Sequence, residues 1–136
     1  LKADPELKDL LFFGPGAQGA QLEGSKDFSK RFMARHGIPT AAYQTFTRES
    51  LAEGLTYLDA HALPIVLKAD GLAAGKGVVI CTDHEEAKAE FRAMIEELKF
   101  GEASAKVVVE QFLAGIELSV FAITDGKDYL LLPEAK

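Results

Sequence analysis

One segment of the sequence combines glycines with lysines in a pattern suited to binding phosphate. Residues 68–77 read KADGLAAGKG, with Lys68 and Lys76 near the two ends. Glycine N–H groups can approach phosphate oxygens closely, and each lysine ammonium supplies a point charge. A Walker A loop is excluded, because Gly71 and Gly75 are too close and neither Ser nor Thr follows Lys76. We therefore expect a mobile hairpin that covers phosphate groups, with a plain flexible surface hairpin as the alternative.

Two carboxylates further along the chain are also candidates for ligand contact. Glu110 follows three valines, and Glu117 follows Gly115 by two positions. A carboxylate beside the free backbone groups of a strand edge can read the hydrogen-bonding edge of a purine, and a second acid can accept hydrogen bonds from ribose hydroxyls. Each acid taken alone is better explained as a solvated strand residue, because Asp and Glu are mostly exposed.

A second glycine-rich segment, residues 14–19 (GPGAQG), has the spacing of a dinucleotide-binding turn. That turn requires a strand–helix–strand unit and an acidic residue ~20 positions later. The chain instead breaks at residues 23–25, and no acid closes a second strand after Pro39. We favour an interdomain turn here, and a nicotinamide-dependent dehydrogenase is the weakest of the functional alternatives.

Composition narrows the class of protein. The chain has 136 residues, 48% of them hydrophobic, and a formal charge of −6, which argues against bulk attraction to nucleic acid or to anionic lipid. No apolar run approaches the ~20 residues needed to span a bilayer, and no signal peptide is visible.

The single cysteine, Cys81, lies in an apolar run, which suits a core thiol in a reducing, cytoplasmic compartment. The first residue is Leu1 and the last run is strand-like, so we expect a part of a larger protein.

Periodicity and turn signals predict the elements that must position these groups. Ser25, Thr47 and Asp83 are expected N-caps of three helices, the last with a capping box to Glu86. Strands are expected over residues 10–13, 42–46, 64–69, 77–82 and 107–112, followed by a hairpin of residues 118–124 and 129–132. This order predicts an α+β fold with a largely antiparallel sheet flanked by helices.

These motifs together resemble the ATP-grasp superfamily, and within it the family of phosphoribosylamine–glycine ligases, also called glycinamide ribonucleotide synthetases. The matching stretches span nearly the whole chain: residues 13–15 (FGP), 21–26 (QLEGSK), 35–40 (RHGIPT), 65–78 (IVLKADGLAAGKGV), 109–113 (VEQFL) and 132–136 (LPEAK). The KADGLAAGKG segment distinguishes this ligase family from other ATP-grasp enzymes.

The resemblance implies a domain organisation. It makes residues 1–15 the tail of a truncated N-terminal α/β domain and residues 16–40 a connecting helix and linker. Residues 41–113 would form the small, or lid, subdomain of an ATP-grasp fold, and residues 114–136 would begin the large subdomain.

The resemblance also implies an ATP site. Lys26 and Lys68 match lysines that contact phosphates, residues 70–77 match the flap over them, residues 110–113 match the adenine-reading strand, and Glu117 matches an acid near the ribose. The expected ATP-contacting residues are Lys26, Lys68, Asp70, Gly71, Gly75, Lys76, Gly77, Glu110, Gln111, Phe112, Leu113 and Glu117. No catalytic residue is assigned within the chain, and the Mg²⁺ ligands are expected C-terminal to Lys136.

The implied activity is that of a cytoplasmic enzyme of purine biosynthesis. It would phosphorylate the carboxylate of glycine with ATP, and the amine of 5-phosphoribosylamine would then displace phosphate from glycyl phosphate. ATP, Mg²⁺, glycine and 5-phosphoribosylamine are the expected ligands, no nucleic acid or membrane partner is expected, and the oligomeric state is not indicated. The segment alone is expected to be inactive. Another ATP-grasp carboxylate–amine ligase and a non-catalytic nucleotide-binding module remain open alternatives.

Overall fold

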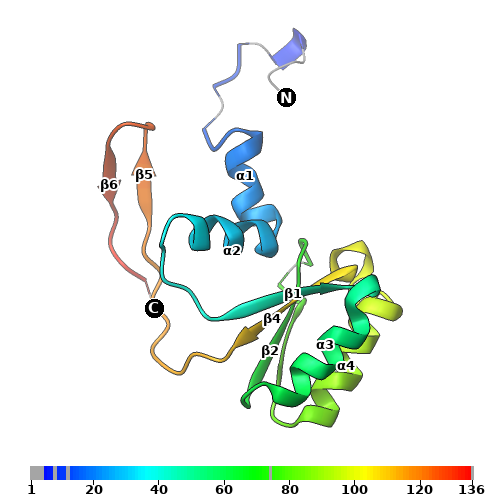
Figure 1. Cartoon of the computed structure of the whole chain (residues 1–136). Helices are drawn as coiled ribbons and strands as arrows, with labels where there is room; N and C mark the ends of the chain where they lie inside the picture. Colours follow the sequence, from blue (N-terminus) through cyan, green and yellow to red (C-terminus); the bar gives the residue numbers. More distant parts are fainter. Residues whose placement is uncertain (1–4, 8, 12, 74, 136) are drawn as a thin grey trace.

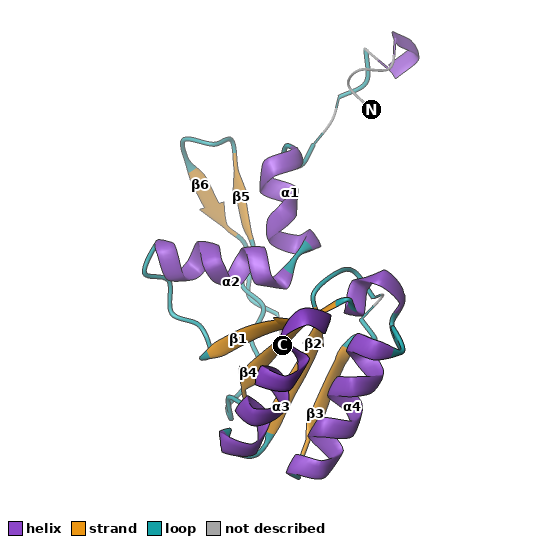
Figure 2. Ribbon diagram, turned by 45° about the vertical axis from the view of Figure 1, so that its right-hand side comes forward, coloured by secondary structure: helices purple, strands orange, loops and turns teal. Residues whose placement is uncertain are grey.

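A four-stranded sheet carries two helices on one of its faces (Figures 1 and 2). The structure, a computed structural model, describes residues 5–7, 9–11, 13–73 and 75–135. The helices are α1 (Ala17–Gly24), α2 (Lys26–Arg35), α3 (Leu51–Ala60) and α4 (His84–Glu96), with short 3-10 turns at Pro5–Leu7, Arg48–Ser50 and Gly101–Ser104. The strands are β1 (Tyr43–Thr47), β2 (Ile65–Ala69), β3 (Val78–Cys81), β4 (Lys106–Gln111), β5 (Ala122–Thr124) and β6 (Tyr129–Leu131).

The sheet has the order β1-β4-β2-β3, and all neighbouring strands are antiparallel. The prediction of an α+β fold with a largely antiparallel sheet is confirmed. Successive side chains of a strand point to opposite faces. Leu67 and Val109 therefore face the helices, whereas Lys68 and Glu110 project from the opposite face.

The core lies between the sheet and helices α3 and α4. Leu58 of α3 and Phe91, Met94 and Ile95 of α4 are buried against strand residues such as Leu67. The rings of Phe46 and Phe91 meet edge to face, with centroids 5.7 Å apart. The face that α4 buries carries Ala87, Phe91, Met94 and Ile95.

Two of the expected N-caps are present as predicted. The Ser25 hydroxyl accepts a hydrogen bond from the Phe28 amide at 3.1 Å, and the Asp83 carboxylate accepts one from the Glu86 amide at 2.8 Å. The Glu86 side chain reaches the amide of Thr82 rather than that of Asp83, so the capping box is displaced by one residue. Thr47 precedes a 3-10 turn, and α3 follows that turn.

Three expectations about the elements are wrong. Residues 10, 11 and 13 form no strand, while Phe12 of the expected strand lies outside the described residues. The segment after Gly16 is helix α1 rather than a turn. The sequence of α1 contains two glycines and the helix buries no residue, so neither helix propensity nor an apolar stripe predicted it. Helix α1 packs against α2. Strand β5 begins at Ala122, four residues later than expected.

The chain leaves the sheet after β4 and ends in the predicted hairpin. Strands β5 and β6 pair around a turn in which the Asp125 carboxylate accepts hydrogen bonds from the amides of Lys127 and Asp128. Figure 1 shows this hairpin beside α2 and apart from the four-stranded sheet. Its strands are exposed along their whole length. Across the described ranges, no helix is both long enough and apolar enough to cross a membrane.

Candidate functional site: a lysine-lined pocket between α2 and the sheet

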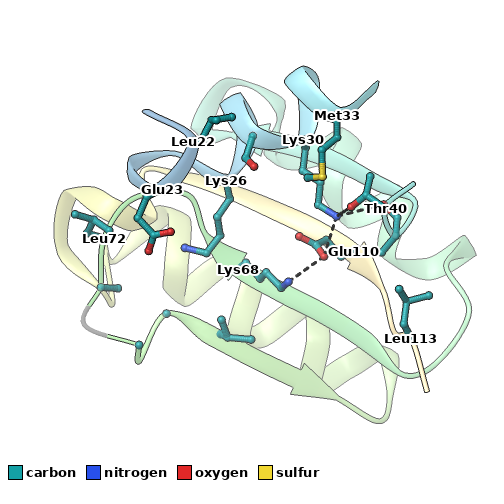
Figure 3. Close-up of a pocket in the computed structure, with 16 residues that line it drawn as sticks. Leu22, Glu23, Lys26, Lys30, Met33, Thr40, Lys68, Leu72, Glu110 and Leu113 are labelled. Atoms are coloured by element: carbon teal, nitrogen blue, oxygen red, sulfur yellow. Dashed lines mark hydrogen bonds and ion pairs between the residues drawn. The ribbon is translucent and has the colours of Figure 1, made fainter. Parts of the chain in front are cut away.

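A pocket of about 910 Å³ lies between α2 and the sheet face that carries Lys68 and Glu110 (Figure 3). The glycine-rich segment between β2 and β3 closes one side of it. The lining residues come from α1, α2, the segment before β1, both strands of the hairpin and the end of β4: Leu22, Glu23, Lys26, Ser29, Lys30, Met33, Thr40, Ala41, Lys68, Leu72, Ala73, Gly75, Gly77, Val78, Glu110 and Leu113.

A carboxylate between two ammonium groups forms the polar centre of the pocket. Oε2 of Glu110 lies 3.0 Å from Nζ of Lys68 and 3.1 Å from Nζ of Lys30. Glu110 is only 5% exposed, so the expectation of a solvated strand carboxylate is wrong. Burial of a carboxylate requires compensation by charge or hydrogen bonds, and the two lysines supply it.

Sequence reasoning did not identify Lys30. Its side chain is buried, and its ammonium donates to Oγ1 of Thr40 at 2.8 Å and to the carbonyl of Ala41 at 3.3 Å. A signal existed, since Lys26 and Lys30 are four residues apart on a predicted helix and must share a face. Which face turns toward the sheet depends on how α2 docks, and that was not predictable from the helix alone.

Lys26 stands at the first turn of α2, beside the start of the glycine-rich segment. Its Nζ donates to the carbonyl of Gly71 at 3.3 Å, and its backbone amide donates to the carbonyl of Asp70 at 3.1 Å. Figure 3 shows its side chain directed between α2 and the hairpin, on the same side of the pocket as Lys68. The sequence-predicted pair Lys26 and Lys68 is thus brought to one cavity.

Asp70 does not line the pocket but binds the start of α2. Its carboxylate accepts hydrogen bonds from the Ser25 hydroxyl at 3.0 and 3.1 Å and from the Asp27 amide at 2.7 Å. Asp27 in turn accepts hydrogen bonds from Thr45 at 2.9 Å and Lys106 at 3.2 Å, and it pairs with Arg31. This polar junction fixes the N-terminus of α2, and hence Lys26, to the end of β2.

The glycine-rich segment forms the predicted hairpin loop between β2 and β3. The Ala69 amide donates to the carbonyl of Gly77 at 2.7 Å, and the Lys76 amide donates to the carbonyl of Ala73 at 2.9 Å. Gly75 has a φ of +76°, which disfavours any residue with a side chain. A Cβ at Gly77 would lie 2.8 Å from Cβ of Ala73 and 3.0 Å from Cβ of Ala69, so the loop also needs a glycine there for space.

The structure brings together about half of the residues expected to contact ATP. Lys26, Lys68, Gly75, Gly77, Glu110 and Leu113 line the pocket. The other expected residues are described in the structure but do not line it: Asp70, Gly71, Lys76, Gln111, Phe112 and Glu117. Of these, Lys76, Gln111, Phe112 and Glu117 are exposed.

The expectation of a free strand edge at Glu110 is also wrong. Strand β4 lies between β1 and β2, so its backbone pairs on both sides. Pairing continues to Gln111, whose amide donates to the carbonyl of Ala42 at 2.9 Å. The backbone beyond this point, at Phe112 and Leu113, is outside the ladder.

Metal binding has no candidate among the described residues. In this part of the chain, no group of three or more His, Cys, Asp and Glu side chains could hold a metal ion. Three of the acids in or beside the pocket have partners: Glu110 contacts two lysines, and Asp27 and Asp70 belong to the junction at α2.

Comparison with known proteins identifies the family. Residues 24–136 match the family of phosphoribosylglycinamide synthetase ATP-grasp (A) domains. The chain belongs to this family. It is 53% identical over 125 residues to a phosphoribosylamine–glycine ligase of Ralstonia nicotianae, an alignment that covers 92% of the chain and 29% of that protein. A phosphoribosylamine–glycine ligase of Listeria monocytogenes is 54% identical over 123 residues, which cover 90% of the chain and 29% of the relative.

Solved structures of the family and of its fold agree with this assignment. Phosphoribosylamine–glycine ligase from Thermotoga maritima is similar with a TM-score of 0.79 and 43% identity, over 90% of this chain and 31% of that one. D-alanyl-alanine synthetase A from Vibrio cholerae shares the fold alone, with a TM-score of 0.72 at 22% identity over 95% of this chain and 38% of that one. The chain thus spans less than a third of the length of these ligases.

Proposed function

We propose that the pocket binds ATP, and that the protein containing this chain joins glycine to 5-phosphoribosylamine. The observation that carries the proposal is the convergence of Lys26, Lys68 and the glycine hairpin on one cavity, in a member of an ATP-grasp family. Two ammonium groups and a glycine backbone suit a polyphosphate, because they offer charge and close approach without steric cost.

Another part of the lining suits a nucleobase. Met33 and Leu113 supply apolar surface, and Glu110 stands near the end of β4, where a purine amino group could donate to it. We propose that this part receives the adenine and that the backbone at residues 112 and 113, which lies beyond the β4 ladder, reads its edge. For Glu117, a ribose contact would require a position nearer the pocket than this structure gives it.

In this proposal the chain supplies binding and charge neutralisation rather than a nucleophile. The γ-phosphoryl group of ATP passes to a carboxylate oxygen of glycine, giving glycyl phosphate and ADP. The amine of 5-phosphoribosylamine then attacks the acyl carbon, and phosphate leaves. Fixed cations beside the transferred group stabilise the charge that develops on it. Mg²⁺ would accompany the phosphates, and we propose that its ligands lie C-terminal to Lys136.

We further propose that residues 41–113 act as the lid subdomain, that residues 1–15 and 16–40 belong to an N-terminal domain and its connection, and that residues 114–136 begin the larger subdomain. The sheet and its two helices, from Tyr43 to Gln111, fall within the lid segment. The connection carries two helices, α1 and α2, and α2 forms one wall of the pocket.

The test is ATP-dependent phosphate release by the complete protein that contains this sequence. Release that requires both glycine and 5-phosphoribosylamine is the expected result. Lys68→Ala should raise the KM for ATP at least about tenfold, with a smaller effect on the KM for glycine, because a fixed charge beside the phosphates is lost. Arg92→Ala, on the exposed side of α4, removes the same charge away from the pocket and serves as the control.

Three results would contradict the proposal or a part of it. ATP binding without turnover in the presence of both substrates would favour a nucleotide-binding module. Turnover with a different carboxylate–amine pair would favour another ATP-grasp ligase. Unchanged kinetic constants for Lys68→Ala would remove the role assigned to that lysine.

A further inference from the structure

Lys30 and Lys68 share one carboxylate oxygen but differ in their other contacts. Lys30 donates hydrogen bonds to Oγ1 of Thr40 and to the carbonyl of Ala41, and its ammonium also forms an ion pair with Oε2 of Glu110. Its side chain is only 8% exposed. Lys68 is 29% exposed, and within the described part of the chain its ammonium donates only to Glu110. Lys68 can therefore turn further donors toward a ligand, whereas the buried ammonium of Lys30 is held by three protein oxygens.

The second ammonium also sets the charge of the pocket. The described lining contains three lysines and two glutamates, Glu23 and Glu110, and so has one net positive charge. Without Lys30, the lining would be neutral and Glu110 would pair with Lys68 alone. In a partly buried site, such an ion pair would keep the Lys68 ammonium bound to the Glu110 carboxylate and would weaken the attraction of Lys68 for a ligand anion.

We propose that Lys30 is a positioning residue that occupies Glu110 and thereby keeps the charge of Lys68 available to the phosphates of a nucleotide. Lys30 makes no ligand contact in this role. The ring of Tyr43, whose centroid lies 5.5 Å from Nζ of Lys30, adds a further favourable contact to the Lys30 ammonium. The inference rests on the proposed binding of ATP in this pocket.

The experiment compares ATP with adenosine, because only ATP carries the phosphates. Dissociation constants for both are measured by titration calorimetry on the complete protein and on its variants, and the readout is the ratio of ATP affinity to adenosine affinity. Lys30→Gln removes the charge and keeps an amide that can still donate to Glu110. We expect this variant to lower the ratio about tenfold or more. A purely structural hydrogen bond would leave the ratio unchanged.

A second pair of variants separates charge from folding. Glu110→Gln alone should raise the ratio, because Lys68 loses its anionic partner while Lys30 keeps its charge. In Lys30→Gln combined with Glu110→Gln, the ratio should return toward that of the unmutated protein. Arg92→Gln is the matched control and should leave the ratio unchanged, since this exposed side chain lies on α4, across the sheet from the pocket.

The outcomes distinguish the inference from the proposed function. An unmutated protein that binds no ATP would overturn both. An unmutated protein that binds ATP, with an unchanged ratio in Lys30→Gln, would overturn the role of Lys30 alone. If Lys30→Gln fails to fold, Glu110→Gln decides the question, because an unchanged or lowered ratio there contradicts the proposal.

Discussion

The carboxylate of Asp70 accepts a hydrogen bond from the backbone amide of Asp27 at 2.7 Å, which joins the first turn of α2 to the end of β2. The two residues are 43 positions apart in sequence. The N-terminal amides of a helix lack partners within the helix, so an acceptor from elsewhere in the chain can satisfy one of them. Asp70 does so from the base of the glycine hairpin, and it also accepts from the Ser25 hydroxyl. Helix docking and hairpin position are thus coupled through one side chain.

Asp70→Ala should therefore destabilise the protein by about 1–2 kcal/mol, the usual cost of a lost N-terminal cap. Asp70→Asn keeps an oxygen acceptor and should lower the free energy of unfolding by less. Chemical denaturation of the complete protein measures both free energies of unfolding. Equal stability of the alanine variant and the unmutated protein would show that the contact adds nothing to the fold.

Asp27 makes stability sensitive to acid. Burial alone would raise the pKa of its carboxyl, but the hydrogen bonds from Thr45 and Lys106, with the charges of Lys106 and Arg31, outweigh burial and lower the pKa. A carboxyl whose pKa is lower in the folded state stabilises the fold above its unfolded pKa of ~3.9, and this contribution is lost as the pH falls through the folded pKa. In Asp27→Asn, the free energy of unfolding should therefore fall less steeply with decreasing pH below about pH 4, as measured by denaturation across a pH series. A curve parallel to that of the unmutated protein would contradict this account.

Gly54 is required for space rather than for backbone freedom. A Cβ there would lie 2.4 Å from Cζ and 2.6 Å from Cε1 of Phe91, a residue of the buried core. Helix propensity favours alanine over glycine, but overpacking of a core costs about 1–3 kcal/mol. Gly54→Ala should lower the melting temperature. Gly24→Ala, where a Cβ would meet nothing within 4 Å, is the control and should not.

Cys81 is fully buried in the core, as the sequence predicted. Burial, reinforced by the nearby charges of Glu86, Glu90 and Asp83, raises the pKa of its thiol to about 11. The reactive thiolate is therefore scarce at neutral pH. A thiol reagent at pH 8 should label Cys81 in the native protein far more slowly than in denaturant. Equal rates in the two conditions would mean that β3 opens readily.

The helix with the strongest local signals was predicted closely. Residues 84–96 combine an aspartate N-cap with an apolar stripe, and both determine local structure without reference to the rest of the chain. Helix α1 was missed for the opposite reason, because its glycines and its lack of a buried face leave it dependent on packing against α2. Strand β4 was found, but its place inside the sheet was not, since strand order is a long-range property.

The sequence by itself determined the caps, the glycine hairpin, the antiparallel α+β class and the family resemblance, because these follow from short-range spacing of residue types. It also indicated that Lys26 and Lys68 would serve one site, through that resemblance. Only the tertiary structure decided that Glu110 is buried between Lys30 and Lys68 and that Asp70 anchors α2. The contacts of Asp70 with Asp27 and of Lys68 with Glu110 join residues 42 or more positions apart. The contact of Lys30 with Glu110 depends on which face of α2 meets the sheet. Neither strand register nor helix docking is encoded in any short stretch of the chain.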